Sequence, residues 1–178
     1  MMKYTGIFMM MKAAPDTKYS SWIIYNIVVC FAVYWLSNLL LWYPWSINET
    51  LGQILMLTIN PLLWGFASYS CMIRYPKTDM LHAVLWNSVI FTIEAIISDL
   101  IFFVVIRTAK DKLMHITTLY AWGFVLFLPI IIYFLFRKSI LRNKRLLIMN
   151  DFWKPLFIGL ASFLIITLII LFNVHFEK

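Results

Sequence analysis

Residues 81–106 read LHAVLWNSVIFTIEAIISDLIFFVVI, an apolar stretch long enough to form a membrane-spanning helix. Such a helix needs about 20 residues, each rising about 1.5 Å, to cross roughly 30 Å of hydrocarbon. The stretch nevertheless contains two carboxylates, Glu94 and Asp99. An Asp at that depth costs roughly 2.5–3.5 kcal/mol on insertion scales, so an intramembrane acid usually marks a pathway, a proton relay or a buried partner.

The rest of the chain has the same apolar character. Its 178 residues are 63% hydrophobic and only 13% charged, with a mean hydropathy of +0.85, whereas about a quarter of the residues in soluble domains are charged. Four further apolar stretches cover residues 22–43, 51–73, 114–136 and 156–174. Runs such as Ile130-Ile131-Ile132 lack the alternating polarity of barrel strands. We therefore predict an all-α polytopic bundle with five transmembrane helices.

The positive charges predict how the chain crosses the membrane. If the N-terminus is cytoplasmic, eleven Lys and Arg residues fall on that side and four on the other, which satisfies the positive-inside bias. We predict a cytoplasmic N-terminus and an outer C-terminus, in an inner or plasma membrane. Residues 1–20 form an N-terminal cytoplasmic or interfacial segment in this interpretation. Residues 21–178 form one transmembrane domain, with a basic cytoplasmic loop at 137–155.

The polar residues of 81–106 gather on one side of the predicted helix. At about 100° per residue they fall within one arc, opposite a purely aliphatic face. They are Asn87, Ser88, Thr92, Glu94, Ser98 and Asp99. The helical rise places Glu94 about 20 Å from Leu81 and about 18 Å from Ile106, near the bilayer centre, and Asp99 roughly 7–8 Å nearer the outer surface.

Polar side chains also share faces on other spans. In the first span, Asn38 and Tyr34 lie on one face, and in the second span Asn60 and Trp64 do. Trp122 belongs to an aromatic belt at the outer end of the fourth span and shares a face there with Thr118. The last span has few polar residues, so we expect the first four spans to surround a polar interior and the fifth to pack peripherally.

These patterns predict a transporter-like protein, or a ligand- or ion-binding unit, with carboxylates in its interior. No Lys or Arg lies inside a predicted span, so a proton, a bound cation or another subunit must neutralise the acids. The predicted proton, cation or ligand site is formed by Glu94, Asp99, Asn60, Asn38, Tyr34, Asn87 and Trp64.

Two alternatives remain open on the sequence alone. In the first, the protein is a non-catalytic membrane subunit or a homodimer whose acids serve helix packing or pair with a basic residue of another chain. In the second, it is a membrane-embedded enzyme, with His115, His175 and a nearby Asp as conceivable metal ligands. No HExxH, GxSxG or CxxC motif supports catalysis or indicates a metal or cofactor. Nor does the basic loop have the features of a nucleic-acid site.

Overall fold

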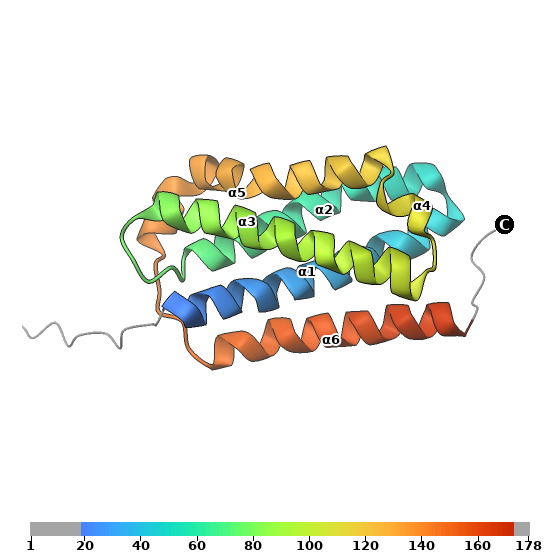
Figure 1. Ribbon diagram of the computed structural model, residues 1–178. Helices are drawn as coiled ribbons and strands as arrows, with labels where there is room; N and C mark the ends of the chain where they lie inside the picture. The colour runs from blue at the N-terminus through green and yellow to red at the C-terminus, as the bar shows by residue number, and fades with distance from the viewer. Residues whose placement is uncertain (1–18, 173–178) are drawn as a thin grey trace, which may run out of the picture.

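The computed structural model describes residues 19–172, without the side chains of 42, 43, 46, 47, 111 and 112 (Figure 1). The predicted N-terminal segment lies almost wholly outside the described residues, and so does His175. The described chain is all helical. Its elements are α1 (Tyr19–Ile47), α2 (Glu49–Met72), α3 (Met80–Asp99), the π-helix η1 (Leu100–Ile106), α4 (Lys110–Leu113), α5 (Ile116–Arg142) and α6 (Asn150–Leu171).

Five helical segments are long and apolar enough to cross a membrane, which confirms the predicted all-α fold with five apolar helices. They cover 19–41, 49–72, 80–106, 116–142 and 150–171, the third one joining α3 to η1. By length and composition the chain suits a multi-pass membrane protein. Within the described residues, these helices account for nearly all of the chain, so the connections between them are short.

The helices extend beyond the apolar stretches at the basic end of the bundle. α5 continues to Arg142 and α6 begins at Asn150, so only residues 143–149 of the stretch 137–155 connect the two helices. Hydropathy marks where hydrocarbon ends, whereas a helix continues as long as its backbone bonds are favourable. Arg142 in the last turn of α5 and Asp151 in the first turn of α6 both complement the helix dipole.

Polar caps fix where α2 and α3 begin. The Asn48 side chain accepts a hydrogen bond from the Leu51 N–H at 3.2 Å, and Asp79 accepts one from the Leu81 N–H at 3.1 Å. His82 Nδ1 lies 2.6 Å from the other Asp79 oxygen, and this contact lowers the pKa of the Asp79 carboxyl. Both helices therefore begin directly after a polar cap residue.

α1, α2, α3 and α5 pack together, while α6 lies along the outer side of α1 (Figure 1). This agrees with the expectation that the last span packs peripherally. The contact depends on Gly159, because a Cβ added there would lie 2.5 Å from Phe31 Cδ1 and 3.0 Å from Ala32 Cα. Only a residue without a side chain lets α6 approach α1 this closely.

The backbone departs from regular α-helix in two places. Phe136 in α5 has φ −113° and ψ 16°, which bends the helix after Pro129. In η1 the bonding widens to an i→i+5 pattern, and the Arg107 N–H donates to the Phe102 carbonyl at 2.9 Å. The π-helix follows Asp99 directly and so places an irregular turn beside one of the two acids.

Candidate intramembrane carboxyl site

A line of polar pairs runs along the interface between α1 and α3. The α1 members are four residues apart, a spacing that keeps them on one helix face. On the α1 side they are Asn26, Cys30 and Tyr34, and on the α3 side they are Asn87, Glu94 and Asp99. We call these six residues the polar ladder. It connects the two polar faces that helical periodicity predicts.

Asp99 is held by donors from two other helices. Tyr34 Oη in α1 donates to Asp99 Oδ1 at 2.6 Å, and Trp122 Nε1 in α5 donates to Asp99 Oδ2 at 2.6 Å. Asp99 itself is only 8% exposed. Short hydrogen bonds to a carboxylate are about twice as strong as neutral ones. Each oxygen of this buried acid therefore has a donor, and α1, α3 and α5 meet at one side chain.

Glu94 and Cys30 form the second pair of the polar ladder. The Glu94 carboxyl is partly buried beside Cys30 and Phe31 of α1. The Cys30 thiol also lies 3.7 Å from the Phe91 backbone carbonyl. Glu94 Oε2 is buried and has no hydrogen-bond partner among the described residues. Because a buried carboxyl oxygen is costly to leave unpaired, this atom is where the ladder can accept a proton or a cation.

The third pair of the polar ladder consists of two side-chain amides, those of Asn26 and Asn87. Asn87 Nδ2 donates to Asn26 Oδ1 at 2.6 Å, and Asn26 Nδ2 donates to the Trp22 carbonyl at 2.7 Å. Both asparagines are fully buried. Asn87 Oδ1 finds no partner in residues 19–172 and remains a second open acceptor on the same face of α3 as Glu94.

The remaining predicted site residues make no described contact with the carboxyls of the ladder. Asn38 donates to the backbone carbonyl of Tyr34 at 3.0 Å. Trp64 packs edge-to-face on Phe91, with ring centroids 5.9 Å apart. Asn60 is partly buried, and its Oδ1 has no partner in the described part of the chain. The structure thus joins Tyr34 directly to Asp99, whereas Asn38 contacts the backbone of Tyr34 and Trp64 contacts Phe91.

Trp122 is the contact that sequence reasoning missed. The sequence places it in an aromatic belt at the end of its span, yet its indole donates to Asp99. Its one signal is the face it shares with Thr118, which is buried. An aromatic residue on the same face as a buried polar residue is better placed for interior hydrogen bonding than for the membrane interface.

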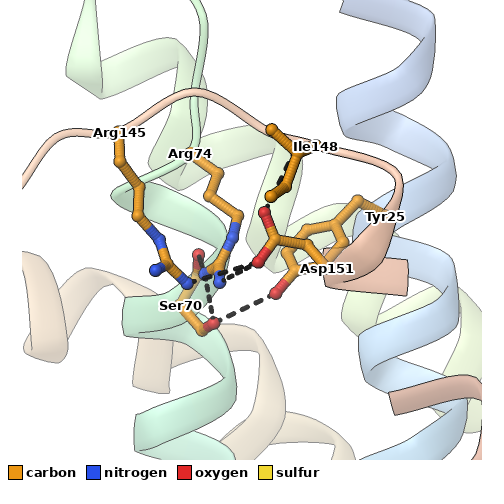
Figure 2. A network of polar contacts seen from close by, with 6 residues as sticks. All are labelled: Tyr25, Ser70, Arg74, Arg145, Ile148 and Asp151. Carbon is orange, nitrogen blue, oxygen red and sulfur yellow. Dashed lines mark hydrogen bonds and ion pairs between the residues drawn. The ribbon is translucent and has the colours of Figure 1, made fainter. Parts of the chain in front are cut away.

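A second polar cluster lies at the end of the bundle where α1 begins (Figure 2). Arg74, only 5% exposed, donates from Nη2 to Asp151 Oδ1 at 2.9 Å and from Nη1 to Ser70 Oγ at 2.6 Å. Its guanidinium also lies 5.0 Å from the centre of the Tyr25 ring. Arg145 approaches the same Asp151 oxygen at 3.4 Å. This cluster joins α1, α2 and α6.

Sequence reasoning treats Arg74 only as a topology-determining charge. Its partner Asp151 is 77 residues away, a separation that no periodic pattern links. Arg74 pairs with Asp151 and makes no described ion pair with Glu94 or Asp99. No group of three His, Cys, Asp or Glu side chains able to hold a metal occurs among the described residues.

Comparison of the chain with protein-family models, with curated proteins and with solved structures finds no match.

Proposed function

We propose that the protein is a transporter-like membrane protein that binds a proton or a small cation at Glu94 and Asp99. The observation that carries this proposal is the buried Glu94 Oε2, which has no partner in the described chain although it lies within a polar ladder. An acid at such a depth is retained at an energetic cost, and a proton or bound cation offsets that cost. In this proposal, the N-terminus is cytoplasmic.

The chemistry of the Asp99 rung supports the same interpretation. Its two donors, the Tyr34 hydroxyl and the Trp122 indole, are neutral groups. They orient the carboxyl but bring no positive charge. In this proposal a proton or a cation balances the charge of Asp99. Glu94, five residues earlier on the same helix, has the open acceptor.

The assembly alternative fits Asp99 less well. Pairing with a basic residue of another chain requires a carboxyl that faces outward. Asp99 is 8% exposed, and its two donors come from α1 and α5 of its own chain. Glu94 is more accessible, so the experiment must separate a bound ion from a partner at that residue.

Glu94→Gln tests the proposal whatever the transported substrate is. A ligand that binds only the folded protein stabilises it, and a group that takes up a proton makes stability depend on pH. We expect the thermal midpoint of the purified wild type to depend on pH, or on Na⁺ or K⁺ concentration. In Glu94→Gln, the part of this pH or cation dependence that comes from Glu94 should be absent.

Glu49→Gln is the matched control, because it makes the same chemical change at an exposed position at the start of α2. It should keep the wild-type dependence. Identical pH and cation profiles for the wild type and Glu94→Gln would contradict the proposal. A basic membrane partner that copurifies with the wild type, but not with Glu94→Gln, would instead support the assembly alternative.

A further inference from the structure

α5 bends near its C-terminal end (Figure 1), where the backbone angles of Phe136 are non-helical. A hollow lies on the protein surface at this bend. The hollow has a volume of about 520 Å³ and is lined by residues 134–139 and Arg142. We call it the α5 hollow. Phe136, where the backbone leaves helical angles, lies at its centre in the sequence. The hollow is distant along α5 from the Asp99 contact, since Trp122 lies near the opposite end of that helix.

Contacts with α2 hold the shape of the α5 hollow. Tyr69 Oη lies 3.0 Å from Ser139 Oγ, and Asn143 Nδ2 donates to the same two oxygens at 3.0 and 3.1 Å. The Tyr69 ring also packs edge-to-face against Phe136, with centroids 6.3 Å apart. These contacts attach the last turns of α5, including the lining residues Phe136 and Ser139, to α2.

The α5 hollow carries three positive charges. Arg137, Lys138 and Arg142 are all exposed. At this end of the described chain the carboxylates are Asp79 and Asp151, and each is paired with other residues. Within residues 19–172, the three cations thus form no ion pair with a carboxylate. The hollow favours an anionic ligand.

Apolar side chains form the other part of the same surface. Phe134 is 71% exposed and Leu135 is 70% exposed, directly before the first of the three cations. In a membrane helix, exposed apolar residues face acyl chains, while basic residues at the end of the span reach the headgroups. The α5 hollow therefore lies across the boundary between hydrocarbon and headgroup.

We propose that the α5 hollow binds an anionic phospholipid. In this proposal the phosphate of the lipid lies among Arg137, Lys138 and Arg142. The acyl chains of the lipid lie along Phe134 and Leu135. A zwitterionic lipid has the same acyl chains but adds a positive charge to the headgroup, which the three cations disfavour. The proposal uses neither Glu94 nor Asp99 and does not depend on the proposed function.

Native mass spectrometry of the full chain in detergent tests this inference. The protein is titrated with phosphatidylglycerol and with phosphatidylcholine of the same acyl chains. Basic residues at a membrane surface contribute about fivefold in affinity each, so three give a preference on the order of a hundredfold. Arg137→Gln/Lys138→Gln/Arg142→Gln should remove most of this preference, while circular dichroism confirms that the variant remains helical.

The matched control is Lys77→Gln/Lys110→Gln/Lys154→Gln, which removes the same net charge at exposed positions outside the hollow. It should keep the preference for phosphatidylglycerol. Equal losses in the two triple variants would overturn the proposal, because net charge alone would then explain binding. Displacement of phosphatidylglycerol by an equal concentration of inorganic phosphate would also overturn it, since the hollow would then recognise a free anion.

Discussion

Asp99 is the residue at which three helices meet. Its two oxygens accept hydrogen bonds from Tyr34 of α1 and Trp122 of α5, while Asp99 itself ends α3. Interhelical hydrogen bonds in membranes contribute only about 0.6 kcal/mol on average, but a buried carboxyl oxygen without a donor costs more. The orientation of Asp99 therefore depends on both donors.

Trp122→Phe tests that dependence at the scale of one atom. The substitution keeps an aromatic ring and removes the N–H that donates to Asp99 Oδ2. We expect a loss of about 1–3 kcal/mol in the free energy of unfolding, measured by denaturant titration in detergent micelles. Trp153→Phe, at a half-exposed position in α6, is the control and should change stability by less than about 0.5 kcal/mol. Equal losses for the two variants would show that the indole bond to Asp99 contributes nothing specific.

At the scale of the element, helical periodicity predicts which side chains share a face of one helix. It does not predict which side chains pair between helices. It identifies the polar faces of 22–43 and 81–106 because the angle per residue determines which side chains share a face. It cannot predict that Asn87 pairs with Asn26, or that Trp122 turns inward to Asp99, since both depend on how neighbouring helices are rotated.

The π-helix has no signal in the sequence either. Residues 100–106 read LIFFVVI, a uniformly apolar run that suits an α-helix equally well. Hydropathy does not predict where the helices end either. α5 and α6 continue beyond the apolar stretches into charged residues that complement their dipoles. The number of apolar helices, by contrast, follows from length and composition alone.

Gly159→Ala tests how α6 is seated on α1. The added methyl would overlap Phe31 and approach the Ala32 backbone, so the helices must separate or Phe31 must move. We expect a loss of about 1–3 kcal/mol in unfolding free energy, typical of overpacking. Gly123→Ala in α5 is the control, because nothing lies within 4 Å of its added Cβ. It should be neutral or stabilising by up to about 1 kcal/mol. A Gly159→Ala variant as stable as Gly123→Ala would contradict the close packing of α6.

At the scale of the whole molecule, α6 is attached to the other helices at two levels. Gly159 sets its distance from α1, and the Arg74–Asp151 pair fastens its first turn to the end of α2 (Figure 2). The pair is nearly buried, with side chains 6% and 14% exposed. Removal of one partner from such a pair leaves a charge without compensation.

Arg74→Gln should therefore destabilise the protein by about 3–5 kcal/mol, measured by unfolding in detergent. Arg74→Gln/Asp151→Asn should recover part of that loss, because neither partner is then left as an isolated charge. Arg145→Gln removes a 56% exposed cation 3.4 Å from the same carboxylate and should cost no more than about 1 kcal/mol. Equal effects of Arg74→Gln and Arg145→Gln would contradict the assignment of Arg74 as the main partner of Asp151.

We propose Glu94 as an ion-binding carboxyl in the membrane interior, and its reactivity tests this most directly. A lipid-soluble carbodiimide reacts with protonated carboxyls in apolar surroundings, and peptide mass spectrometry locates the modified residue. We expect modification of Glu94 in the membrane-embedded protein and protection by whichever of raised pH, Na⁺ or K⁺ affects stability. In Glu94→Gln, modification at position 94 should be absent. The exposed Glu49 should stay unmodified. Absence of modification at Glu94, or equal modification of Glu94 and Glu49, would show that Glu94 is no such carboxyl.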